Sequence, residues 1–125
     1  MTKPRVLIAE DNPDLREVYS FVLAEGGFEV KEASNGREAI ESIKQEPPDV
    51  FITDIMMPEV TGVEIVKWLK AEANMDELPV IVISAYPDYL AKCYLTGATR
   101  VIRKPFDPHL LLDAVFFELS KKTEH

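Results

Sequence analysis

Short apolar runs that alternate with segments of helical periodicity are the feature that most limits how this chain can fold. The runs at residues 6–9, 50–53 and 79–84 consist mainly of β-branched and other apolar side chains and contain no charged residue. Uninterrupted runs of this kind are typical of strands buried on both faces, as in a parallel sheet covered by helices. Asp54 directly follows the second run, so we expect this carboxylate at the carboxyl end of a central strand. Ligands of open α/β sheets bind at that edge.

Helical periodicity fills the intervals between these runs. Residues 13–24 place apolar side chains three and four positions apart, with Asn12 as a suitable N-cap, Pro13 at the first helical position and two glycines after the end. The same reasoning predicts four further helices, at residues 36–46, 62–73, 88–96 and 107–121.

Two shorter segments complete the set of strands. Residues 28–33 alternate between apolar and charged side chains, which suits an edge strand, and residues 99–102 form a short fifth strand. Five strands that alternate with five helices predict a parallel sheet with right-handed crossovers. Because the second strand has the character of an edge, the sequence favours a doubly wound α/β fold with strand order 2-1-3-4-5, flavodoxin-like, with helices on both faces.

Composition narrows the functional classes. The length of 125 residues suits a single domain spanning residues 1–125, with no output domain in this chain. A net charge of -8 disfavours nucleic-acid binding and attachment to an anionic membrane surface. The single cysteine, Cys93, excludes an internal disulfide, and we expect it to be an apolar filler rather than a redox sensor. No apolar stretch approaches the length of a membrane span, so a soluble cytoplasmic domain is the expectation.

Polar side chains gather at the carboxyl edge of the predicted sheet. The first and third strands are neighbours in this order and deliver Glu10, Asp11 and Asp54 to one region. Three carboxylates that lie close together repel one another and must protonate, pair or bind a cation. Mg²⁺ is the expected partner, because it takes hard oxygen ligands and keeps waters for phosphate oxygens. The fourth strand ends in the hydroxyl of Ser84 and the fifth in the ammonium of Lys104.

This combination suits phosphoryl transfer to a carboxylate. Mg²⁺ and Lys104 neutralise charge on the transferring group while Asp54 acts as the nucleophile. Each element alone is weak, because strand-ending serines, Lys-Pro pairs and solvated Glu-Asp pairs are common. Their joint placement on successive strand ends is much more specific.

Four motifs, in this order and spacing, resemble the receiver domains of two-component response regulators. They are Ile-Ala-Glu-Asp-Asn at 8–12, Thr-Asp-Ile-Met-Met-Pro at 53–58, Ile-Ser-Ala at 83–85 and Lys-Pro-Phe at 104–106. The resemblance covers essentially the whole chain. It implies that Asp54 accepts a phosphoryl group from a histidine kinase or a histidine phosphotransfer protein.

The resemblance also implies a role for each site residue. Asp11, Asp54 and the main-chain carbonyl of Met56 would hold Mg²⁺, with Glu10 acting through water. Ser84 and Lys104 would contact the phosphoryl oxygens. The domain would then be a phosphoacceptor rather than an enzyme that turns over a substrate. The phosphorylated state would reshape the surface of the fourth helix, fifth strand and fifth helix. A homodimer through this surface is one possible assembly.

One position departs from the family pattern. Three residues before the lysine the family usually has a tyrosine or phenylalanine, whose ring moves inward on activation, and this chain has Val101. Valine sweeps far less volume than an aromatic ring, so we expect signalling without an aromatic flip. The chemistry at Asp54 is not threatened by this change.

The last helix carries two apolar rows. Its expected core face consists of Leu111, Leu112, Val115, Phe116 and Leu119. A second row, formed by Leu110, Ala114 and Phe117, is either part of a wide core stripe or a surface for a partner or second copy.

Three other functions compete with this interpretation. A phosphohydrolase of the haloacid dehalogenase type requires an acidic residue two positions after its nucleophile, where this chain has Met56. A flavodoxin-like module requires a loop after the first strand that binds a flavin phosphate, and the carboxylates there would repel it. A receiver-like domain that binds partners without phosphorylation is the third. The sequence leaves open whether the chain is a stand-alone regulator, a relay shuttle or a receiver excised from a longer protein.

Overall fold

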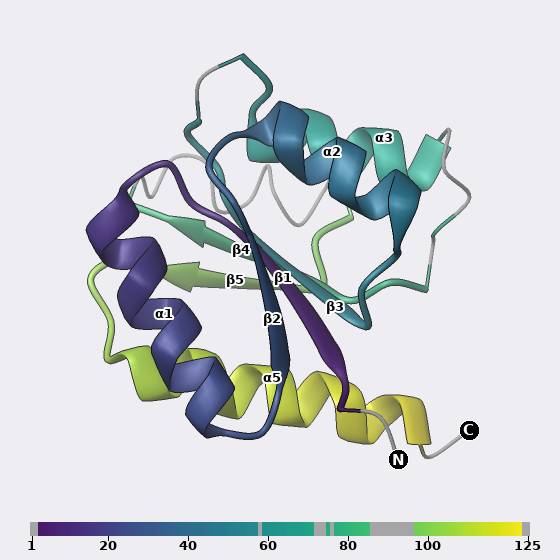
Figure 1. The fold of residues 1–125 in the computed structure, drawn as a ribbon. Coiled ribbons are helices and arrows are strands. Elements are labelled where there is room, and N and C mark those ends of the chain that lie inside the picture. Colours follow the sequence, from purple (N-terminus) through teal and green to yellow (C-terminus); the bar gives the residue numbers. More distant parts are fainter. Residues whose placement is uncertain (1–2, 58, 72–74, 76, 86–96, 124–125) are drawn as a thin grey trace.

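One parallel sheet with strand order 2-1-3-4-5 organises the molecule, as the sequence predicted (Figure 1). The computed structural model describes residues 3–57, 59–71, 75, 77–85 and 97–123. The strands are β1 (Arg5–Ala9), β2 (Glu29–Ala33), β3 (Val50–Asp54), β4 (Val80–Ser84) and β5 (Arg100–Arg103). β2 lies at one edge and is largely exposed, which agrees with its alternating sequence.

Helices cover both faces of this sheet. They are α1 (Pro13–Glu25), α2 (Gly36–Gln45), α3 (Gly62–Ala71) and α5 (Pro108–Thr123). α1 and α5 lie together on one face, and α2 and α3 lie on the other (Figure 1). The helix predicted at residues 88–96, which includes Cys93, falls outside the described residues. None of the helices in the described part of the chain has both the length and the apolar character that crossing a membrane requires.

The ends of the helices follow their capping residues. Asn12 caps α1, because its side-chain oxygen accepts hydrogen bonds from the amides of Asp14 and Leu15. Asn35 caps α2 in the same way, through the amide of Glu38. The last helix starts one residue later than predicted, since Asp107 stays outside it and its carboxylate accepts a hydrogen bond from the amide of His109.

The strands supply two cores because successive side chains point to opposite faces. Leu7 and Phe51 join the core beneath α2 and α3, whereas Ile8 and Ile52 join the core beneath α1 and α5. Every residue of β3 and β4 is buried, which explains why these two strands read as continuous apolar runs.

The prediction for one residue of α5 is wrong. Phe116 was expected in the core, but 49% of it is exposed, and its ring packs against Phe28 at the rim with centroids 5.0 Å apart. In the second row, Ala114 is buried, as the wide core stripe required, whereas Leu110 and Phe117 are exposed. The stripe that faces the sheet is therefore centred on Leu111 and Val115, both with no exposed surface.

Candidate functional site

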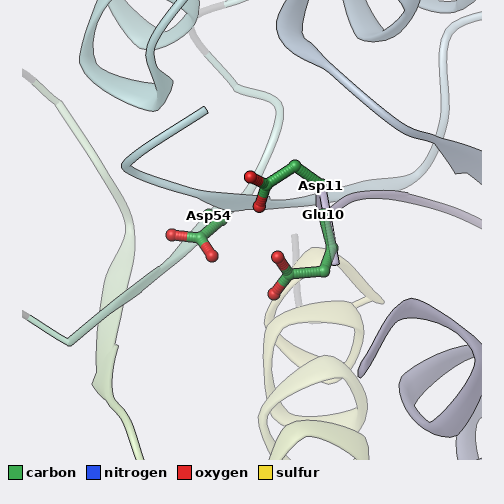
Figure 2. Close-up of side chains that lie close together, drawn as sticks. All are labelled: Glu10, Asp11 and Asp54. Atoms are coloured by element: carbon green, nitrogen blue, oxygen red, sulfur yellow. The ribbon is translucent and has the colours of Figure 1, made fainter. Parts of the chain in front are cut away.

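The carboxyl ends of β1 and β3 bring together the three acidic residues that the sequence singled out (Figure 2). One carboxylate oxygen from each of Glu10, Asp11 and Asp54 lies within 4.8 Å of the others. The two strands are hydrogen-bonded neighbours, with Ala9 opposite Thr53, so the residues that follow them emerge side by side. Glu10 and Asp54 are buried and Asp11 is exposed, which leaves the cluster open to solvent on one side.

Lys104 reaches into this cluster from the end of β5. Its Nζ donates a hydrogen bond of 2.6 Å to Oδ2 of Asp54 and one of 2.9 Å to Oε1 of Glu10. The lysine side chain is only 19% exposed, so both ion pairs are shielded from water. The sequence predicted Lys104 at this edge, and the structure joins it to two of the three carboxylates.

One cation cannot balance three carboxylates, and the pKa values reflect this. Burial raises the pKa of Glu10 to about 7, against the lowering effect of the hydrogen bond from Lys104, and the charge of Asp54 raises it further. Burial disfavours the charged form of Lys104, but hydrogen bonds to Asp54 and Glu10 outweigh it and raise the pKa of the lysine. Lys104 is therefore charged, and the site has an excess of negative charge.

The main chain around Asp54 is held closely. The amide of Met56 donates a hydrogen bond of 3.2 Å to Oδ1 of Asp54, which brings the Met56 backbone beside the carboxylate. The Met56 side chain is 44% exposed. Gly62, where α3 begins, packs directly against the backbone of Asp54 and Ile55, and a Cβ at Gly62 would lie 2.6 Å from the carbonyl oxygen of Asp54.

Ser84 is fully buried at the end of β4, in the position that the sequence predicted. Its carbonyl accepts a hydrogen bond of 2.8 Å from the amide of Lys104, and it lies opposite Arg103 in the sheet. The main chain that carries the predicted hydroxyl is thus bonded directly to the main chain that carries the lysine.

Sequence reasoning missed two residues that shape the site. Arg16, on α1, donates a hydrogen bond of 2.8 Å from Nη1 to the carbonyl oxygen of Glu10. Gly62 allows α3 to start against the end of β3. A helical arginine and a glycine before a helix have many structural uses, so neither carried a signal that the sequence alone could separate from background.

The donor set fits a hard divalent cation. Carboxylate oxygens from three residues converge, one of them exposed, and the excess negative charge favours a cation over an anion. A main-chain segment, that of Met56, lies at the same place and can offer a carbonyl oxygen.

Comparison with known families decides which class of protein has this arrangement. The family model described as the response regulator receiver domain matches residues 6–116. The chain belongs to this family. Membership agrees with the resemblance drawn from the four motifs and favours it over the phosphohydrolase and flavin-binding alternatives.

Relatives and solved structures agree with this assignment. This chain is 33% identical over 110 residues to the phosphate regulon transcriptional regulatory protein PhoB of Escherichia coli. The matched segment covers 86% of this chain and 48% of PhoB. The chain therefore spans about half the length of that relative. It is 35% identical over 81 residues to the polar-differentiation response regulator DivK of Brucella anthropi, covering 65% of this chain and 66% of DivK.

Two solved structures of similar size share the fold. The chemotaxis response regulator CheY4 of Vibrio cholerae is 31% identical, with a TM-score of 0.86 and coverage of 94% of this chain and 99% of that one. The receiver domain of the Francisella response regulator 1452 is 27% identical, with a TM-score of 0.89 and coverage of 95% and 98%.

The other predicted residues of this receiver domain lie away from the carboxylates, along β5 and α5. Val101 is half-buried, whereas Leu110 and Phe117 are 48% and 52% exposed. All three line an open groove of about 1020 Å³ between β5 and α5. The guanidinium of Arg100 lies 5.0 Å from the centre of the Phe117 ring. The fourth helix, predicted as part of this surface, lies outside the described residues.

Proposed function

We propose that this receiver domain accepts a phosphoryl group on Asp54 in a reaction that requires Mg²⁺. The observation that carries the proposal is the contact of 2.6 Å between Lys104 Nζ and Asp54 Oδ2, beside a cluster of three carboxylates. A carboxylate that is held in place and paired with a cation, in a cluster that is open to solvent on one side, suits a nucleophile.

The donor is the phosphohistidine of a histidine kinase or a histidine phosphotransfer protein. An Asp54 carboxylate oxygen forms the new bond to phosphorus while the bond from phosphorus to the histidine nitrogen breaks. The electron pair of that bond stays on the imidazole. The domain is thus a phosphoacceptor that takes part in its own modification, and it does not turn over a separate substrate.

Mg²⁺ and Lys104 would share the neutralisation of charge at Asp54. Asp11, Asp54 and the main-chain carbonyl of Met56 would hold Mg²⁺, with Glu10 acting through water. When bound, Mg²⁺ neutralises charge on the transferring phosphoryl group. Lys104 already contacts Asp54, so its ammonium is in reach of a phosphoryl group placed there.

Ser84 and Lys104 would carry the signal outward. Phosphorylation adds about -1.5 to -2 charge and three acceptor oxygens, which draw in the Ser84 hydroxyl and the Lys104 ammonium. Because the Lys104 amide is bonded to the Ser84 carbonyl, movement at the end of β4 is passed to β5 through the main chain. This route requires no aromatic ring at position 101, where the chain has a valine.

The surface of the fourth helix, β5 and α5 would respond, including Val101, Leu110 and Phe117. This surface would meet an output partner or a second copy of the chain. The domain would act in the cytoplasm, and its net charge of -8 disfavours direct contact with nucleic acid.

The test is intact-protein mass after incubation with a small-molecule phosphodonor, with and without Mg²⁺. We expect a gain of one phosphoryl group in the wild type with Mg²⁺, none in Asp54→Asn, and an unchanged gain in Asp113→Asn, which removes an exposed carboxylate on α5. No gain under any condition, in a wild-type protein that unfolds cooperatively, would reject the proposal in favour of binding without phosphorylation.

A further inference from the structure

Arg16 links three elements at the edge of the site. It lies in the first turn of α1, and its side chain is only 20% exposed. Nη1 donates a hydrogen bond of 2.8 Å to the carbonyl oxygen of Glu10, and Nε donates one of 3.1 Å to Oε1 of Glu32 on β2. One guanidinium therefore ties α1 to the end of β1 and to the edge strand.

The carbonyl that Arg16 holds belongs to the peptide between Glu10 and Asp11. The amide of Glu10 still donates to Ala33 of β2, at 3.1 Å, so this is the point where the chain leaves the sheet. The two residues on either side of the peptide carry carboxylates with different surroundings, one buried and one exposed. Their oxygens nevertheless meet within 4.8 Å. The plane of this peptide determines how both side chains are presented.

We propose that Arg16 is a positioning residue for the cation site. By fixing the carbonyl of Glu10, it orients the Glu10–Asp11 peptide so that both carboxylates face Asp54 in the absence of the cation. The inference rests on the proposed function, since it assumes that these carboxylates hold a divalent cation. It adds to that function a residue that contacts neither the phosphoryl group nor the cation.

The sign of the effect separates positioning from charge. A guanidinium near three carboxylates repels a divalent cation, so if Arg16 acted only through its charge, removing it would tighten Mg²⁺ binding. If Arg16 acts by orienting the peptide, removing it weakens Mg²⁺ binding. Partners that orient metal ligands typically contribute roughly 10- to 100-fold to metal affinity.

The test is titration of the full chain with Mg²⁺ by calorimetry. We expect Arg16→Gln to raise the Kd for Mg²⁺ by about tenfold. The Kd of Arg16→Lys should fall between those of this variant and the wild type. An ammonium keeps the positive charge, but it lacks the planar set of donors with which the guanidinium holds both partners. Lys67→Gln is the matched control, since it removes the same charge from an exposed position on α3 and should not raise the Kd.

A second readout needs no metal. Backbone ¹⁵N order parameters of Asp11 and Asn12 should fall in Arg16→Gln from about 0.85 toward 0.6, while those of Leu7 and Ile8 within β1 stay unchanged. A Kd for Arg16→Gln equal to or below that of the wild type would overturn the inference, as would an unchanged order parameter at Asp11. If the wild type takes up no Mg²⁺, the proposed function fails by itself, and a rigid Asp11 in Arg16→Gln then rejects the positioning role independently.

Discussion

The ammonium of Lys104 lies 2.6 Å from Oδ2 of Asp54, although 50 residues separate them in the chain. This contact exists because β3 and β5 flank β4 in the sheet and all three end at the same edge. It joins the expected nucleophile of a receiver domain to a half-buried ammonium. The same ammonium also holds Glu10, so one residue offsets charge on two carboxylates.

Removing this cation should destabilise the metal-free protein in a manner that depends on pH. Lys104→Met keeps the aliphatic stem but leaves the buried carboxylates uncompensated, which we expect to lower the free energy of unfolding by about 3 kcal/mol at pH 8. The loss should be smaller at pH 5, because the raised pKa of Glu10, about 7, leaves that carboxyl protonated and without need of a counterion. Urea unfolding in the presence of a chelator measures both values, with Lys67→Met as an exposed control. An equal loss at the two pH values would assign the effect to packing instead.

A second prediction concerns the pH dependence that Glu10 itself produces. Its pKa is raised to about 7 in the folded state, so the folded protein binds this proton more tightly than the unfolded chain does. The free energy of unfolding should therefore decline as the pH rises from about 4.5 through about 7, because the folded protein must then bury a charge.

The comparison that isolates this group is with Glu10→Gln, which keeps the shape and an oxygen acceptor for Lys104. We expect the metal-free wild type to lose on the order of 2 kcal/mol relative to Glu10→Gln between pH 5 and pH 8. Urea unfolding at intervals across this range provides the measurement. Parallel stability curves for the two proteins would contradict the raised pKa.

The sequence predicted the sheet order and the acidic edge because both depend on patterns that are local in the chain. The runs at β3 and β4 are continuous since both strands are buried on both faces, and Asp54 stands at the end of one. The other contacts depend on tertiary geometry. Arg16 bonds to the Glu10 carbonyl only because α1 folds back over the end of β1, and no residue pattern announces that.

The same limit explains the error at Phe116. Helical spacing places Phe116 beside Leu112 and Leu119, but the width of the buried stripe is set by how α5 sits against α1 and the sheet. In the folded protein Leu112 packs over Gly26 at the end of α1, and Phe116 lies at the rim, against Phe28. Spacing alone indicates which side of the helix a residue is on, and it does not indicate where the core ends.

Gly62 should prove necessary for the geometry of the nucleophile. A Cβ at this position would meet the carbonyl oxygen of Asp54 and the Cα of Ile55, both of them backbone atoms that cannot swing aside. We expect Gly62→Ala to lower the free energy of unfolding by about 1–3 kcal/mol and to slow phosphorylation of Asp54 by displacing its backbone. Chemical unfolding and the mass assay described above measure the two effects.

Gly27→Ala is the control for this substitution. Gly27 has a φ of 100°, so an alanine there is strained, yet a Cβ would meet no heavy atom within 4 Å. It should lower stability by about 1 kcal/mol without changing the rate of phosphorylation. Equal phosphorylation rates in Gly62→Ala and the wild type would show that the end of β3 tolerates the displacement.

Glu59 offers a prediction in the opposite direction. It lies in the loop between β3 and α3 with a φ of 69°, a left-handed conformation that is unfavourable for a residue with a long side chain. Its ion pair with Arg37, at 3.7 Å between exposed side chains, contributes little to stability. Glu59→Asn should therefore raise the free energy of unfolding by roughly 0.5–1 kcal/mol, because asparagine adopts this conformation more readily.

Glu59→Ala is the control for this substitution. It loses the same ion pair but keeps the backbone strain, so its free energy of unfolding should not rise. If the alanine variant were as stable as the asparagine variant in urea unfolding, the gain would come from removing a negative charge from a chain of net charge -8 rather than from the backbone.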